Sequence, residues 1–289
     1  MTTANASGGA TAPRSTASKN PPSPASSRQF SGPGRLAAGP AIRIVMLSFL
    51  VLVGLLAYLG LRPHQSWLLW LTAAIAGLGT DGIVRCHPAW HDRRAGASLL
   101  YFGLPALAVF GSGLFIHEAL NGYSRPLAAI PPSLAIGLIA HAEYQTVDFT
   151  ARRYGALRLG LAVAAYLSAF ALYSMLMRPE VDVLFSAAAI MLVSGVLTLE
   201  LLRENRLFGE GAILLAIAVG LSIAELRLVL YFFPLDSLLG GALLVIGFYL
   251  ATGLVHHVLD HDLEWNTAAE YGVVAVAAAA AVIVTRLLV

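Results

Sequence analysis

The feature that most constrains this chain is a series of apolar runs, each about as long as a bilayer is thick. From Ala41 onward, runs of roughly 20 mostly apolar residues follow one another with short polar joints. Only 12% of the residues are charged and the mean hydropathy is +0.75. A soluble domain carries about 25% charged residues. The sequence therefore predicts a membrane-spanning protein whose main partner is the lipid bilayer.

The runs predict an all-α fold, a polytopic transmembrane helical bundle of about nine spanning helices. Helices are expected because backbone groups inside lipid must find their hydrogen bonds within their own segment. The joints between several runs are short, so neighbouring helices are expected to be antiparallel. The predicted spans cover residues 41–61, 66–85, 97–120, 127–147, 155–177, 183–202, 208–233, 235–259 and 267–289. Together they define a transmembrane domain over residues 41–289.

Residues 1–40 differ in composition and are predicted to form a disordered cytoplasmic tail. They are rich in Ser, Ala, Thr, Gly and Pro, and they carry four basic residues and no acid. Such a segment has too little apolar surface to offset its ordering entropy, and its basic residues would hold it near anionic lipid. The alternative is an organelle transit peptide, although the prolines disfavour the amphipathic helix that such a peptide forms.

The basic residues predict the orientation of the chain in the cell membrane. Thirteen of the 18 Lys and Arg residues lie in the tail or on the same side of the predicted spans, and four lie on the opposite side. Cytoplasmic segments carry the excess of Lys and Arg in membrane proteins. The bias predicts a cytoplasmic N terminus and, with nine spans, a C terminus outside.

Weak self-similarity at an offset of 116 residues predicts a duplication. Residues 62–63 match 178–179, and residues 137–141 match 253–257. Each copy would contain four helices, an even number, so the copies would share one orientation as a parallel repeat, four plus four, with the ninth helix added. Chance agreement between common apolar residues is the alternative. The predicted repeats are residues 42–157 and 158–273.

Polar residues gather at the predicted cytoplasmic ends of the even-numbered spans. On a helix, His257, His261 and Glu264 lie at i, i+4 and i+7, which is one face. His141 and Asp148 repeat that spacing in the predicted fourth span. The candidate polar cluster comprises His141, Asp148, His257, Asp260, His261 and Glu264. The alternative interpretation is that helix ends meeting water carry polar residues in any case.

Histidine and carboxylate ligands from several helices are how bundles hold metals, so a transition metal is a candidate cofactor. Neither His-x2-His-His nor His-Glu-x2-His occurs, so the motifs of membrane di-iron hydroxylases and zinc metalloproteases are absent. The one cysteine, Cys86, excludes an intramolecular disulfide, and the one lysine, Lys19, lies in the tail, which excludes a retinal Schiff base. The candidate metal ligands are His87, His91, His141, His257 and His261.

Charged residues inside the seventh predicted span mark a second candidate site. Glu225 and Arg227 are two residues apart, so they do not face each other on a helix. Arg227 can snorkel outward, whereas Glu225 is predicted to be a buried carboxylate that needs a partner such as His117 or Arg125. Four other charged residues are interpreted as a solvated helix end with local ion pairs, namely Glu200, Arg203, Glu204 and Arg206.

No motif identifies a named chemistry, so three functions are weighed. The first is a small-molecule or ion transporter, which the duplication and Glu225 favour. The second is a metal-dependent membrane enzyme acting on a lipid or isoprenoid. The third is a scaffold or accessory subunit without a site of its own. The net charge of +2 gives no reason to expect a nucleic acid partner.

Overall fold

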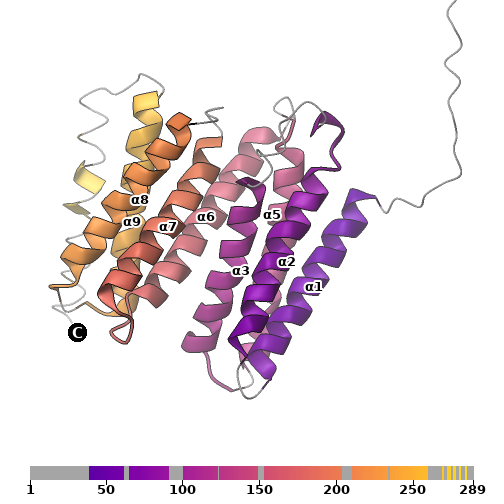
Figure 1. Ribbon diagram of the computed structural model, residues 1–289, viewed down its shortest axis with the longest axis horizontal. Coiled ribbons are helices and arrows are strands. Elements are labelled where there is room, and N and C mark those ends of the chain that lie inside the picture. The colour runs from indigo at the N-terminus through magenta and orange to yellow at the C-terminus, as the bar shows by residue number, and fades with distance from the viewer. Residues whose placement is uncertain are drawn as a thin grey trace, which may run out of the picture. The chain divides into compact units, whose positions relative to one another are not determined.

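Eight of the nine predicted spans correspond to helices in the computed structural model (Figure 1). It describes residues 39–61, 65–90, 100–122, 124–148, 153–203, 210–233 and 235–259, with isolated residues between 269 and 284. The long helices are α1 (Pro40–Gly60), α2 (Ser66–Val84), α3 (Leu100–Ala119), α5 (Ile130–Gln145), α6 (Tyr154–Leu176), α7 (Val183–Leu202), α8 (Glu210–Leu230) and α9 (Ser237–Leu259). The five-residue α4 (Ser124–Ala128) precedes α5, and a 3-10 turn, η1 (Pro88–Trp90), follows α2.

The predicted fold class, a polytopic transmembrane helical bundle, is confirmed. Within the described ranges, seven helices are long and apolar enough to cross a membrane: α1, α2, α3, α6, α7, α8 and α9. The 16-residue α5 is the shortest of the long helices. The predicted ninth span, residues 267–289, lies mostly outside the described residues, as do residues 1–38 of the predicted tail. The expected number of nine spans is therefore approximate.

Several helix boundaries follow directly from the sequence. Proline stands at the start of α1 (Pro40) and of α5 (Pro131 and Pro132), where the backbone donor that proline lacks has no intrahelical partner anyway. Asp182 caps α7, because its Oδ1 accepts hydrogen bonds from the backbone N–H groups of Leu184 and Phe185, both at 2.9 Å.

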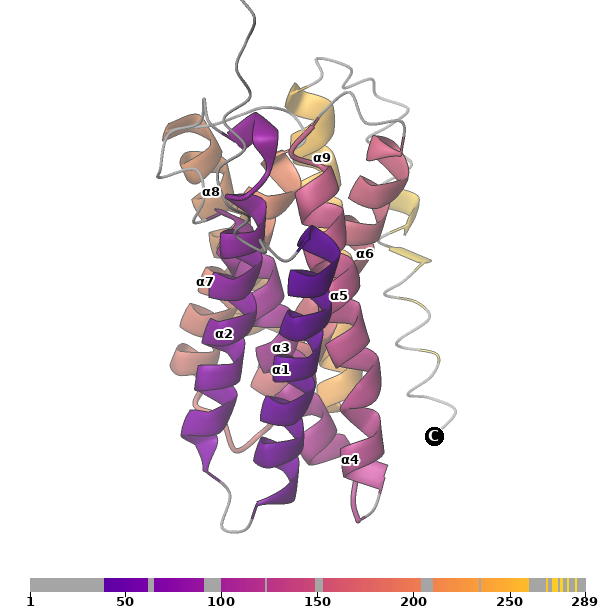
Figure 2. The same ribbon diagram turned by 90° about the vertical axis from the view of Figure 1, so that its right-hand side faces the viewer.

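The long helices run alternately up and down and lie roughly parallel to one another (Figure 2). As a result α1, α3, α6 and α8 begin at the same end of the bundle at which α2, α5, α7 and α9 finish. We call this the polar end, and the other the opposite end. At the opposite end, exposed aromatic side chains follow α8 and begin α2: Trp67, Tyr231, Phe232 and Phe233. Aromatic residues of this kind concentrate at membrane–water interfaces.

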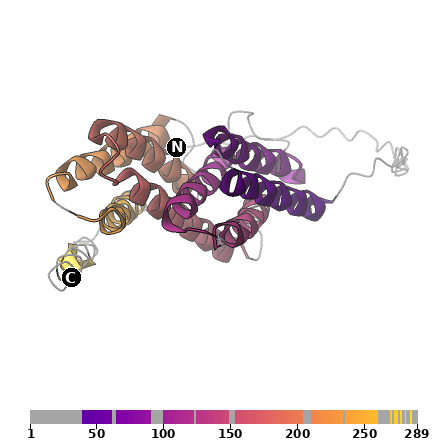
Figure 3. The same ribbon diagram turned by 90° about the horizontal axis from the view of Figure 1, so that it is seen from below.

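The helices form two groups of four with the same pattern of contacts. In the first group, α1 packs against α2 and α5, and α2 and α5 both pack against α3. In the second group, α6 packs against α7 and α9, and α7 and α9 both pack against α8. The indigo and magenta helices of the first group and the orange helices of the second lie on different sides in Figure 3. This arrangement is the one that a four-plus-four repeat requires, and the duplication itself stays a prediction.

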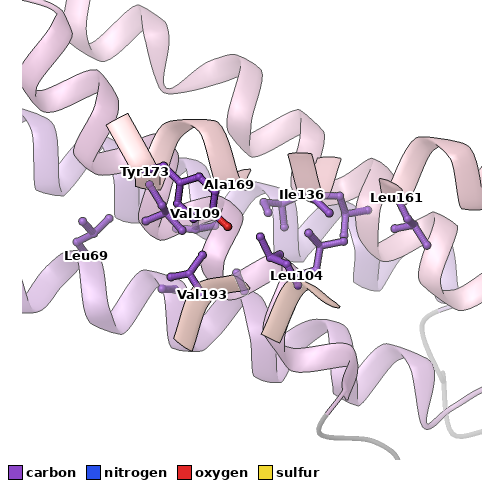
Figure 4. Close-up of a cluster of buried hydrophobic side chains, with 14 of the residues drawn as sticks. Leu69, Leu104, Val109, Ile136, Leu161, Ala169, Tyr173 and Val193 are labelled. Carbon is purple, nitrogen blue, oxygen red and sulfur yellow. The ribbon is translucent and has the colours of Figure 1, made fainter. Parts of the chain in front are cut away.

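The two groups meet along α3 and α6, where the centre of the bundle is filled with apolar side chains. Leu104 and Val109 of α3 meet Leu161 and Ala169 of α6, and none of the four is more than 2% exposed. Figure 4 shows these side chains with neighbours from α2, α5 and α7. Interiors of this kind are close-packed, so changes of volume are poorly tolerated.

Small residues allow the closest helix approach in the second group. A Cβ atom added to Gly220 of α8 would lie 2.5 Å from the backbone oxygen of Met191 in α7, and 3.4 Å from the backbone nitrogen of Gly195. Small residues at helix crossings are how membrane helices bring their backbones together.

We expect Gly220→Val to destabilise the bundle by about 1–3 kcal/mol, because the added side chain would press on a backbone oxygen that cannot turn away. Gly160→Val is the matched control, since a Cβ there meets nothing within 4 Å. Denaturant unfolding of both variants in detergent micelles measures the difference. Equal loss of stability in the two variants would contradict the close α7–α8 crossing.

Candidate functional site

Five charged side chains are buried together at the polar end, and we call them the buried ionic cluster. Asp81 comes from the end of α2, Glu143 from the end of α5, Arg158 from the start of α6, and Glu200 and Arg203 from the end of α7. None of the five is more than 7% exposed. Ionisable groups within a membrane domain are costly, by about 2.5–3.5 kcal/mol each on insertion scales, and usually serve a function.

Glu200 is the centre of the ion pairs. Its Oε1 accepts a hydrogen bond from Nη1 of Arg158 at 3.2 Å, and its Oε2 accepts one from Nη1 of Arg203 at 2.8 Å. Nη2 of Arg158 also donates to the backbone oxygens of Glu200 and Leu201, at 3.1 and 3.2 Å. Both carbonyls belong to the last turn of α7, where helical hydrogen bonds run out, and the Leu201 oxygen also accepts from the backbone N–H of Arg203. Arg158 therefore both pairs with Glu200 and caps the helix that carries it.

Arg203 connects this pair to the first group of helices. Its guanidinium carbon lies 4.0 Å from the centre of the Tyr101 ring of α3, within the range of a cation–π interaction. Trp90 contacts the same tyrosine edge-on, with ring centres 5.6 Å apart. Among the described residues, Nη2 of Arg203 is a buried donor that finds no hydrogen-bond partner.

Asp81 lies between the cluster and the surface. Its Oδ2 pairs with Nη2 of Arg85 at 2.6 Å, one helical turn further along α2, and the Arg85 side chain is 54% exposed. The other carboxylate oxygen, Oδ1, is buried and has no hydrogen-bond partner in the described part of the chain. One side of Asp81 therefore faces a solvent-accessible cation and the other faces the interior.

Glu143 is the most unusual member of the cluster. Its side chain is 0% exposed, and neither carboxylate oxygen has a hydrogen-bond partner among the described residues. Glu200, Arg203, Arg158 and Asp81 all lie within electrostatic range of it. A buried carboxylate without hydrogen bonds loses the solvation of water and gains little in return. Such a group calls for a specific explanation in a native structure.

The predicted histidine cluster does not come together within the described part of the chain. His141 and Asp148 are exposed, His257 of α9 is half-buried, and His87 contacts Tyr144 edge-on with ring centres 4.7 Å apart. Among the described residues, no group of three His, Cys, Asp or Glu side chains is placed to share a metal ion. The other predicted members, His91, Asp260, His261 and Glu264, lie outside the described residues. The predicted metal site gains no support from this arrangement and stays a prediction.

Two predictions about charged residues are wrong. Glu225 is exposed on the surface of α8, and the residue that α8 buries is Arg227, whose Nε donates to the Ser186 hydroxyl of α7 at 3.1 Å. Two residues apart, the side chains point to different sides of the helix, so only one can face α7. Glu200 and Arg203 do form a local ion pair as predicted, but they are buried at the centre of the cluster rather than solvated, and Glu204 and Arg206 lie outside the described residues.

The opposite end carries an exposed counterpart to these buried ion pairs. Arg178, in the turn after α6, pairs with Glu118 of α3 and with Glu180, the latter at 3.2 Å. The hydrogen bond to the Glu118 carboxylate is the main cause that raises the pKa of the Arg178 guanidinium above its ordinary value. Surface pairs of this kind contribute little to stability because water and salt screen them.

Fold and cluster together define a polytopic membrane protein with an ion-pair cluster buried at one end of its bundle. The chain belongs to a family described as protein of unknown function (DUF5656), whose model matches residues 44–285. No curated protein and no solved structure matches the chain significantly. Its function must therefore be argued from the site.

We expect Arg158→Met to destabilise the protein by about 3–5 kcal/mol, because it removes one partner of a buried ion pair and leaves Glu200 with no water in place of the lost guanidinium. Arg178→Met, which breaks the exposed pairs at the opposite end, should cost about 1 kcal/mol or less. Denaturant unfolding in micelles at neutral pH compares the two variants. The buried pair would be of no structural importance if both lost the same stability.

Proposed function

We propose that this protein is an ion transporter that moves protons across the membrane, with Glu143 as the group that takes up and releases each proton. The observation that carries the proposal is the burial of the Glu143 carboxyl, with neither oxygen hydrogen-bonded to any residue that the structure describes. Intramembrane carboxylates of transporters commonly serve as proton relays. A proton needs no room and no coordination shell, so it suits a site packed on every side.

The charged groups near Glu143 come from three other helices. Asp81 of α2 and Glu200 of α7 are acids and favour its protonated form, whereas Arg158 of α6 and Arg203 of α7 favour the charged form. Tyr101 of α3 borders the cluster through Arg203. Three acids and two arginines are buried here, so one added proton balances the buried charges of these five groups. Arg85 offsets Asp81 only from the exposed side, where solvent screens it.

The position of the cluster supports a coupling role. Asp81, Tyr101 and Glu143 belong to the first group of four helices, and Arg158, Glu200 and Arg203 belong to the second. A change of charge at Glu143 therefore alters the electrostatic attraction between the groups. Alternating access in transporters of repeated architecture arises from movement of one repeat against the other. The packed centre between α3 and α6 corresponds, under this proposal, to a closed state.

The test is proton flux in liposomes that contain the purified protein and a trapped pH-sensitive dye, driven by a potassium diffusion potential. We expect the wild type to acidify the lumen several-fold faster than protein-free liposomes, and Glu143→Gln to reduce the rate to background because the amide cannot exchange a proton. Glu225→Gln is the matched control, since Glu225 is exposed on α8 and remote from the cluster. Wild-type flux equal to that of empty liposomes would overturn the proposal, as would flux unchanged by Glu143→Gln.

We also propose that the polar end faces the cytoplasm, because the distribution of basic residues predicts this orientation. Cys86, the one cysteine of the chain, is exposed just beyond α2 at this end. It therefore reports the orientation without further engineering. The opposite end offers Asn121, an exposed residue in the turn after α3, as a matched position.

We expect a membrane-impermeant maleimide to label Cys86 only after cells are permeabilised. In a Cys86→Ala background, Asn121→Cys should be labelled in intact cells. Mass shift of the purified protein measures the labelled fraction. The reverse pattern would show that the polar end faces outward.

A further inference from the structure

An apolar groove lies on the side of the bundle, in the half toward the opposite end. It is formed by the second halves of α3 and α6 together with α4 and the start of α5, and its volume is about 400 Å³. This is within the range of about 300–1,000 Å³ typical of small-molecule sites. The groove is separate from the buried ionic cluster, which lies at the other end of α5.

Side-chain size explains why the groove exists. The wall contributed by α4 and α5 consists of small or compact residues, including Ala128, Pro131 and Ala135. Spaced three and four apart, these residues share one face of the chain as it passes from α4 into α5. The floor is aromatic, because Phe115 of α3 and Phe170 of α6 contact each other with ring centres 6.2 Å apart. Small side chains on the wall and aromatic rings on the floor therefore leave a space that the described residues do not fill.

The chemistry of the lining restricts what can occupy it. Among the described lining residues, Ser112 alone carries a hydroxyl, and it already donates to the backbone oxygen of Ala108 at 2.6 Å. A ligand with polar groups would have to bury them here without partners, at a cost of roughly 1–3 kcal/mol for each group. An occupant that is hydrocarbon throughout avoids this cost.

The lipid bilayer around the bundle contains such an occupant. The groove opens on the flank of the seven candidate spans, and Leu167 of α6, which lines it, is 64% exposed. In a bilayer, exposed apolar surface of such spans faces acyl chains. We propose that the groove binds one acyl chain of a bilayer phospholipid as a specific ligand. This inference is independent of the proposed transport function.

The experiment uses the full chain in phosphatidylcholine liposomes that contain a small fraction of phosphatidylcholine with a diazirine in mid-chain. Irradiation releases N2, and the carbene inserts into neighbouring C–H bonds, so mass spectrometry of peptides maps where the chains lie. We expect adducts on the groove segments 112–116, 131–135 and 167–171 to exceed those on the exposed face of α8 several-fold. The exposed face of α8, which includes Leu214 and Ala218, reports contact with bulk lipid.

Filling the groove provides the decisive comparison. Ala135→Phe should lower groove labelling several-fold and leave α8 labelling unchanged, whereas Ala218→Phe on the exposed face of α8 should leave groove labelling unchanged. Ala128→Phe tests the same wall from α4 if Ala135→Phe does not fold. The proposal is overturned if groove and α8 segments are labelled equally, which would mean bulk lipid only. It is also overturned if the groove is not labelled, which would mean that another segment, such as residues 267–289, covers it.

Discussion

The carboxylate of Glu200 is the interaction on which the polar end of this bundle depends. One oxygen binds Arg158 of α6 and the other binds Arg203 of α7, so two buried cations share one anion. Without it both guanidinium groups would lose their ion-pair partner in a buried site, which is far more costly than the loss of a surface pair. Arg203 can then lie on the Tyr101 ring and join α7 to α3. Because this arrangement satisfies Glu200 fully, it leaves Glu143 as a carboxyl without a hydrogen-bond partner among the described residues, and a structural role for the cluster does not explain why Glu143 is there.

The spans could be read from the sequence because the bilayer imposes a length, and the described helices follow the predicted runs closely from α1 to α9. Which side chains of each helix face the interior of the bundle could not be predicted in this way. In a soluble protein the polar face of a helix marks the outside, but lipid-facing and core-facing sides of a membrane helix are both apolar. Glu225 and Arg227 show the consequence, since nothing in the sequence of α8 says which of the two faces α7. Glu200 and Arg203 show it again, because their i, i+3 spacing fits a solvated helix end as well as a buried pair.

Contacts between residues far apart in sequence, rather than local sequence patterns, therefore form the buried ionic cluster. Arg158 and Glu200 are 42 residues apart in sequence, and Arg203 reaches Tyr101 across an even longer separation. The histidines, by contrast, have a clear helical spacing but sit on surfaces that the described helices do not bring together. His141 is exposed on α5, while α9, which carries His257, packs against α6, α7 and α8. Regular spacing within one helix predicts a shared face, but it does not show that the faces of two helices meet.

The short helix α5 links the two features that set this protein apart from a uniform bundle. With 16 residues it is shorter than its neighbours, and a straight helix of this length covers about 24 Å rather than the roughly 30 Å of a hydrocarbon layer. At the polar end α5 carries Glu143 into the cluster, and at the opposite end its small residues leave the groove open. A chain in the groove would press on the same helix that holds Glu143 among the arginines. With lipid in the groove and Glu143 in the cluster, both would act on a single helix, and α5 is where an effect of one on the other would have to pass.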